Sequence, residues 1–125
     1  MQNNKKTILI IDDEASLRNV LHNKLEKEGF TVLTAQDGKE GWEKVCQKPD
    51  LVLMDLMLPE IPGEKILKLM NEKGLIKEIP VIILSVKGDD ANMQNCLKIL
   101  GAKDYLVKSD YTLNEILKKI NKYIG

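Results

Sequence analysis

Short apolar runs recur along the chain and set its predicted architecture. Two of them, Ile8–Ile11 and Leu51–Met54, contain only apolar residues. Runs of this length, rich in residues that favour strands and bounded by polar residues, are typical of strands buried on both faces of a sheet. With three further runs, they predict five strands. The predicted strands are Thr7–Ile11, Thr31–Ala35, Leu51–Asp55, Val81–Ser85 and Tyr105–Val107.

Amphipathic segments separate these runs. In the first segment Leu17, Val20, Leu21 and Leu25 recur at steps of three and four, which places them on one face of a helix that Gly29 ends. The same spacing predicts four more helices, the second ended by Pro49 and the last begun by a capping box of Thr112 and Glu115. These helices are predicted at Gly41–Lys48, around Ile66–Met70, along Met93–Leu100 and along Leu113–Ile120.

Strand and helix alternate five times, with no internal repeat, linker or low-complexity stretch between them. This alternation predicts an α/β fold: a doubly wound parallel sheet of five strands, with five helices covering both of its faces. Because crossovers are right-handed, few strand orders are open, and 2-1-3-4-5 is one of the two common ones. In that order the first and third strands are neighbours.

Carboxylates follow those two strands. Asp12 and Asp13 come directly after the first strand, and Asp55 closes the third. Acids at helix starts are often structural caps, but two in a row beside a third acid favour a site. Parallel strands place such residues together at the carboxyl edge of the sheet, where crowded carboxylates repel one another and need a cation. Oxygen ligands alone suit a hard divalent ion, so we predict a Mg²⁺ site.

Two further polar residues close strands at the same edge. Ser85 ends the fourth strand, and Lys108 follows the fifth. Each alone is an ordinary loop residue, but the predicted fold brings both beside the acids. A carboxylate nucleophile, a metal site, a hydroxyl and an ammonium are the groups that phosphoryl transfer needs. The edge is therefore predicted to accept a phosphoryl group.

Composition narrows the possibilities. The chain has 125 residues, and 19 Lys and Arg balance 19 Asp and Glu, which gives no support to nucleic-acid or membrane binding by bulk charge. We expect one domain over residues 1–125. Cys46 and Cys96 lack metal-ligand spacing and are predicted to be free thiols. With no signal peptide and no apolar stretch of membrane-spanning length, a cytoplasmic protein is expected.

The chain resembles the receiver domains of bacterial two-component response regulators (the CheY-like superfamily). The resemblance covers essentially the whole chain and implies the same 2-1-3-4-5 sheet, a flavodoxin-like fold. Each matching stretch is weak alone, but all of them in order at the family's spacing are specific. The matching stretches are Ile10-Ile11-Asp12-Asp13-Glu14 with Arg18, Asp55-Leu56-Met57-Leu58-Pro59 with Gly63, Leu84-Ser85, and Gly101 to Lys108.

The resemblance implies a role for each residue of the metal and phosphoryl site. Asp55 matches the aspartate that accepts the phosphoryl group. Asp13 matches the direct ligand of Mg²⁺, and Asp12 matches the acid that holds the ion through water. Met57 matches the position whose backbone carbonyl binds the metal. Lys108 matches the lysine that pairs with the phosphoryl group.

Two further residues match the family's switch. Ser85 stands at the position of the hydroxyl that binds a phosphoryl oxygen, and Tyr105 at that of the aromatic that turns inward when the hydroxyl moves. Three residues depart from the usual pattern: Ser109 replaces a proline, Val86 replaces a smaller residue, and Lys87 occupies a variable position. Since only proline makes a cis bond cheap, we predict a trans Lys108–Ser109 peptide.

The predicted function is a phosphorylation-activated switch without an output domain and without classical enzyme activity, which assists its own phosphorylation and dephosphorylation. A histidine kinase or histidine phosphotransfer protein would supply the phosphoryl group. An output protein would bind the last strand and last two helices, and the chain would be a monomer or a phosphorylation-dependent dimer. Two alternatives stay open: a degenerate receiver that binds proteins independently of phosphorylation, and a haloacid-dehalogenase-like phosphatase.

Overall fold

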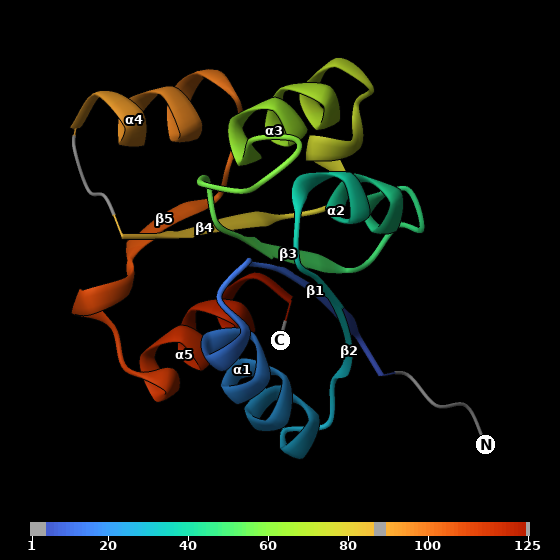
Figure 1. Cartoon of the computed structure of the whole chain (residues 1–125), viewed down its shortest axis with the longest axis vertical. Coiled ribbons are helices and arrows are strands. Elements are labelled where there is room, and N and C mark those ends of the chain that lie inside the picture. The colour runs from blue at the N-terminus through green and yellow to red at the C-terminus, as the bar shows by residue number, and fades with distance from the viewer. Residues whose placement is uncertain (1–4, 87–89, 125) are drawn as a thin grey trace.

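The sheet has the predicted topology. The computed structural model describes residues 5–86 and 90–124, and its five strands are all parallel in the order β2-β1-β3-β4-β5 (Figure 1). The apolar runs therefore form strands, as predicted. The strands are β1 Thr7–Ile11, β2 Thr31–Ala35, β3 Leu51–Met54, β4 Val81–Ser85 and β5 Asp104–Val107.

Helices cover both faces of the sheet. In Figure 1, α1 and α5 lie on one side and α2, α3 and α4 on the other. Short 3₁₀ turns at Leu75–Lys77 and Lys108–Asp110 and a π-helical segment at Asn95–Ile99 complete the fold. The α-helices are α1 Ala15–Lys27, α2 Gly38–Val45, α3 Gly63–Glu72, α4 Asp90–Gln94 and α5 Leu113–Ile124.

Alternate strand residues supply two separate cores. Ile8 and Ile10 of β1 pack with Leu21 and Leu25 of α1 and with the buried face of α5. Leu9 and Ile11 belong to a second cluster, on the other face of the sheet, with residues of α2 and α3. Because both faces of each strand are buried, the strands read as continuous apolar runs rather than as alternating ones.

Two helices differ from their predicted limits. The second was predicted at Gly41–Lys48, but it runs from Gly38 to Val45. It starts earlier because the Asp37 side chain caps it by accepting from the Glu40 N–H at 2.8 Å. It ends before Lys48, which has a left-handed φ of +58°, so Pro49 is not what ends it. The fourth was predicted as one continuous helix, but it changes from α to π geometry after Gln94. The hydrophobic spacing carries no signal for that change.

Other local predictions are confirmed. Gly29 ends α1 with a left-handed φ of +97°. At the start of α5, the Thr112 N–H donates to Glu115 and the Glu115 N–H donates back to the Thr112 hydroxyl, at 2.8 and 3.2 Å. No peptide bond in the described ranges is cis, so the Lys108–Ser109 bond is trans, as predicted.

The loop after β3 folds back against the strand that carries Asp55. The Gly63 N–H donates to the Leu56 carbonyl at 2.9 Å, and the Gly38 N–H donates to the Pro59 carbonyl at 3.0 Å. A Cβ atom at Gly63 would lie only 2.4 Å from the Asp55 carbonyl oxygen. Glycine at this position therefore permits the close approach that anchors the residues next to Asp55.

Candidate functional site

The three predicted acids meet at the carboxyl edge of the sheet. Ile11 of β1 is paired with Met54 of β3, so Asp12 and Asp55 are the next residues on two neighbouring strands. Asp12 is 2% exposed and Asp55 is 5% exposed, whereas Asp13 is exposed. One carboxylate oxygen from each of the three acids lies within 4.8 Å of the others. Their predicted convergence is confirmed.

Every polar group of Asp12 forms a hydrogen bond or an ion pair. Its backbone N–H donates to the Ala35 carbonyl at 3.1 Å, and its Oδ1 accepts from the Glu14 N–H at 2.9 Å. Its Oδ2 lies 2.9 Å from Lys108 Nζ. Its backbone carbonyl accepts from Arg18 Nη1 at 2.7 Å. These contacts come from β2, from the turn before α1, from α1 itself and from the end of β5, so Asp12 is fixed in place.

Asp55 has two donors. Its Oδ1 accepts from the Met57 N–H and its Oδ2 from Lys108 Nζ, both at 3.1 Å. Burial raises the pKa of the Asp55 carboxyl, and the two hydrogen bonds and the Lys108 charge only partly oppose that rise. A further cation near Asp55 would favour its ionised form.

Lys108 joins the acids of β1 and β3. Its side chain is 13% exposed, and Nζ contacts Asp12 and Asp55 directly and Glu14 at 3.7 Å. Burial lowers the pKa of the Lys108 ammonium, but its hydrogen bonds and attraction to Asp12 and Asp55 outweigh burial and raise the pKa overall. Lys108 is therefore a cation fixed beside Asp55, as predicted from its position after β5.

Ser85 and Tyr105 lie on neighbouring strands beside this site. Ser85 is the last residue of β4, 1% exposed, and is paired with Val107, which precedes Lys108. Tyr105 is 4% exposed and belongs to the core on the α2 and α3 side of the sheet. Ser85 is thus at the predicted edge, and the Tyr105 side chain is buried.

The comparisons with known proteins agree with this geometry. A family model of the response regulator receiver domain matches residues 8–121. The chain belongs to this family.

Relatives and solved structures support the receiver assignment. The alkaline phosphatase synthesis transcriptional regulatory protein PhoP of Bacillus subtilis is 39% identical over 104 residues, which are 82% of this chain and 42% of PhoP. The phosphate regulon transcriptional regulatory protein PhoB of Pseudomonas aeruginosa is 38% identical over 82% of this chain and 45% of PhoB. The receiver thus spans less than half the length of these relatives. The Francisella response regulator 1452 receiver domain superimposes with a TM-score of 0.86 at 28% identity, covering 95% of this chain and 96% of that chain.

The acidic pocket of this receiver has the ligand chemistry of a hard divalent metal ion. Three carboxylates and one ammonium leave it two negative charges, and every acidic ligand atom is an oxygen. Asp13 has no hydrogen-bond or ion-pair partner among the residues that the structure describes, so its carboxylate is available to a cation. The donor set therefore fits the metal that the sequence predicted.

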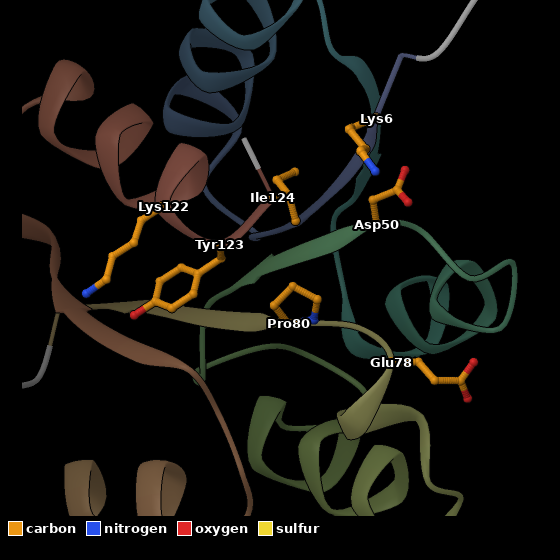
Figure 2. A pocket seen from close by; sticks show the side chains of 7 residues that line it. All are labelled: Lys6, Asp50, Glu78, Pro80, Lys122, Tyr123 and Ile124. Atoms are coloured by element: carbon orange, nitrogen blue, oxygen red, sulfur yellow. The ribbon is translucent and has the colours of Figure 1, made fainter.

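A hollow near the opposite edge of the sheet is unrelated to these groups. It has a volume of about 420 Å³ and lies between the starts of the strands and the end of α5. Figure 2 shows its lining side chains, among them Lys6, Asp50 and Tyr123. None of the predicted site residues lines it, so the chemistry belongs to the carboxyl edge.

Sequence reasoning missed two contacts of the receiver site. It gave Arg18 no role, yet Arg18 bonds to the Asp12 carbonyl. It considered only the Met57 carbonyl, yet the Met57 N–H holds Asp55. Both contacts involve backbone atoms, which no pattern of side chains encodes.

Of the residues predicted to depart from the family pattern or to border the site, Lys87 lies outside the described residues. The side chains of Met57 and Val86 are 55% and 62% exposed beside the site. No helix in the described ranges is long and apolar enough to cross a membrane.

Proposed function

We propose that this receiver accepts a phosphoryl group on Asp55 in a Mg²⁺-dependent reaction and relays that event as a change of conformation. The observation that carries the proposal is the pairing of a buried carboxylate, Asp55, with a fixed ammonium, Lys108, at 3.1 Å and beside two further acids. A carboxylate with a fixed ammonium on one side and further acids on the other can bind a cation and an anion together.

The metal ligands would be the carboxylates of Asp13 and Asp55 and the backbone carbonyl of Met57, with Asp12 acting through water. When bound, Mg²⁺ would neutralise charge on the phosphoryl oxygens and orient the phosphoryl group. The donor chemistry of the acidic pocket supports this assignment. Met57 contributes only backbone atoms, which agrees with a side chain that is 55% exposed.

In the transfer step, a carboxylate oxygen of Asp55 attacks the phosphorus of a phosphohistidine. The new P–O bond forms as the P–N bond breaks, and the electron pair of that bond returns to the donor imidazole. The Met57 N–H and Lys108 fix the direction of the Asp55 carboxylate before the attack. Lys108 then pairs with a phosphoryl oxygen where charge accumulates.

The signal would depend on Ser85, Lys108 and Tyr105. A phosphoryl group on Asp55 would draw the Ser85 hydroxyl and the Lys108 ammonium toward it, and Tyr105 would pack into the space that Ser85 leaves. Moving a two-state equilibrium from mostly inactive to mostly active takes about 5.5 kcal/mol. Hydrogen bonds to charged groups contribute about 1.5–3 kcal/mol each, so a few such bonds provide the required energy.

The phosphodonor would be a histidine kinase or a histidine phosphotransfer protein. The output protein would bind β5, α4 and α5, and the receiver would act as a monomer or a phosphorylation-dependent dimer without contacting nucleic acid itself. Cys46 and Cys96 are free thiols, which supports function in the reducing cytoplasm.

The two alternative functions fit the site less well. A receiver that works without phosphorylation has no need for a complete set of acid, hydroxyl and lysine. A haloacid-dehalogenase-like phosphatase would carry Asp-x-Asp after its first strand, whereas here the sequence is Asp12-Asp13-Glu14 and the fixed carboxylate follows β3.

The test is phosphorylation by acetyl phosphate, a small acyl phosphate, followed by intact-mass spectrometry. The parent protein should gain one phosphoryl group with Mg²⁺ and none with a chelator, and Asp55→Asn should gain none. Asp50→Asn is the matched control, because Asp50 precedes β3 at the opposite edge of the sheet and should leave phosphorylation intact. Phosphorylation of Asp55→Asn, or phosphorylation that ignores the chelator, would refute the assignment.

A further inference from the structure

Asp13 is more exposed than the other two acids and lacks the hydrogen bonds that fix them. Asp12 and Asp55 are buried and each is held by directed hydrogen bonds, whereas Asp13 is exposed and its carboxylate has no partner in residues 5–86 and 90–124. Its oxygen nevertheless lies within 4.8 Å of oxygens from both other acids. Since no side-chain contact within these ranges fixes the Asp13 carboxylate, its direction depends on the backbone of residues 12 and 13.

The peptide group between Asp12 and Asp13 is held by Arg18. Arg18 Nη1 donates to the Asp12 carbonyl oxygen at 2.7 Å, a short distance that fits a charged donor. Because a peptide unit is planar, fixing the carbonyl of Asp12 also fixes the plane of the Asp13 N–H. Arg18 thereby restricts rotation of the peptide plane that ends at the Asp13 Cα, the atom from which the Asp13 side chain extends toward the other acids.

The position of Arg18 suits this role. Arg18 is the fourth residue of α1, and its own N–H donates to the Glu14 carbonyl at 3.0 Å. Its backbone therefore lies one helical turn beyond the segment Asp12–Glu14, whose Asp12 carbonyl its side chain contacts. Its side chain is half-buried and also lines a small polar hollow of about 260 Å³ with Thr34 and Lys44. Within the described part of the chain, Arg18 forms no ion pair with a carboxylate, so its charge is directed at a carbonyl.

We propose that Arg18 is a positioning residue for metal binding: through the Asp12 carbonyl it holds the Asp13 carboxylate in the direction that a cation requires. The inference rests on the proposed metal site and adds a residue to it. A purely electrostatic role predicts the opposite sign, because a cation close to a metal site weakens metal binding and its removal would strengthen it.

The test measures Mg²⁺ affinity by isothermal titration calorimetry on the unphosphorylated protein. Arg18→Met keeps most of the aliphatic stem but removes the donors and the charge, and should weaken Mg²⁺ binding about tenfold, as loss of an outer hydrogen bond to a metal site does. Arg18→Lys restores a charged donor and should recover most of the affinity. Lys24→Met is the matched control, since Lys24 is also on α1 but pairs with Glu28 and not with the acids of the site, and should bind as the parent does.

A second readout separates positioning from general damage. The initial rate of phosphorylation by acetyl phosphate should fall about tenfold in Arg18→Met at limiting Mg²⁺ and equal the parent rate at saturating Mg²⁺. Urea unfolding without Mg²⁺ shows which variants are folded. If Arg18→Met is unfolded, Arg18→Gln replaces it, because its shorter amide cannot span the same distance, and the same loss is expected.

The outcomes are distinct. A parent protein that binds no Mg²⁺ would overturn both the metal site and this inference. A parent that binds Mg²⁺ together with an Arg18→Met variant that binds equally or more tightly would overturn the inference alone. The inference is also overturned if Arg18→Lys binds as weakly as Arg18→Met, or if the Arg18→Met rate stays low at saturating Mg²⁺.

Discussion

Lys108 Nζ lies 3.1 Å from Asp55 Oδ2, although 53 positions separate the two residues in the sequence. The same ammonium lies 2.9 Å from Asp12. One half-buried ammonium thus offsets part of the charge of two buried carboxylates, and the stability of the site without metal depends on it.

Replacing Lys108 with methionine should therefore destabilise the metal-free protein by about 3 kcal/mol, because removing one partner of a buried ion pair leaves charges uncompensated. Urea unfolding in the presence of a chelator measures the effect. Lys118→Met, at an exposed position of α5, is the control and should change the free energy of unfolding by less than about 0.5 kcal/mol. A Lys108→Met variant as stable as the parent would show that the acids do not repel one another significantly.

Mg²⁺ should stabilise the unphosphorylated fold, because the ion relieves the repulsion among Asp12, Asp13 and Asp55. At ten times its dissociation constant the expected gain is about 1.4 kcal/mol. Asp13→Ala should lose most of the resulting rise in melting temperature, whereas Glu43→Ala, which removes an exposed acid of α2, should keep it. An unchanged rise in Asp13→Ala would place the metal elsewhere.

The phosphoryl group on Asp55 should be long-lived. Hydrolysis needs a water held in line with the phosphorus. Met57 and Val86 are exposed apolar side chains beside Asp55 and Ser85, and a thioether is a weak acceptor that orients water poorly. Met57→Asn should speed the decay by up to about tenfold, equivalent to one hydrogen bond of about 1.4 kcal/mol in the transition state.

The decay of phosphorylated protein after removal of the donor measures this lifetime. Val20→Asn is the matched control, because Val20 is an exposed apolar residue of α1 and its replacement should leave the decay unchanged. Equal decay rates in the parent and Met57→Asn would mean that this side chain does not control access of water.

The two cysteines should differ in reactivity. Cys46 is exposed, whereas burial, with a smaller contribution from Glu64, raises the pKa of the Cys96 thiol from 9.0 to about 11. At about pH 8, iodoacetamide should modify Cys46 in the folded protein and reach Cys96 only after urea is added. Peptide mass mapping gives the alkylation rates of Cys46 and Cys96, and equal rates in the folded protein would contradict the prediction.

The same pKa shift makes stability depend on pH. Since folding raises the pKa of the Cys96 thiol, the stability that Cys96 contributes is complete below about pH 9 and is lost between pH 9 and 11.

Hydrophobic periodicity predicted the strands, because each run is buried on both faces and leaves a continuous apolar segment such as Leu51–Met54. It left two common strand orders open, and the family resemblance implied the one that the sheet has. The periodicity did not predict the first turn of α2, which depends on the Asp37 cap, or the π-helical segment Asn95–Ile99. In that segment Asn95 Nδ2 lies 3.5 Å from Glu64 of α3, a contact that arises only when the two helices pack. Helix boundaries that depend on tertiary contacts cannot be predicted from the local spacing of apolar residues.

The candidate site was predictable where a polar side chain ends a strand. Asp12, Asp55, Ser85 and Lys108 all stand at such positions, and the fold brings them together. The contribution of Arg18 was not predictable, because a guanidinium that bonds to a backbone carbonyl leaves no complementary residue in the sequence.

The strand order has a consequence for how the protein assembles. Asp12, Asp55 and Lys108 follow β1, β3 and β5, so the chain must close loops of about forty or more residues before the three groups meet. Such long-range parallel pairing is slow, and the edge strand β5 supplies the cation to acids already carried by the interior strands. A nascent chain that has emerged only as far as β4 holds all three carboxylates but no lysine partner for them. Metal ions in the surrounding solution would then take the place of the Lys108 ammonium beside these acids until translation reaches residue 108.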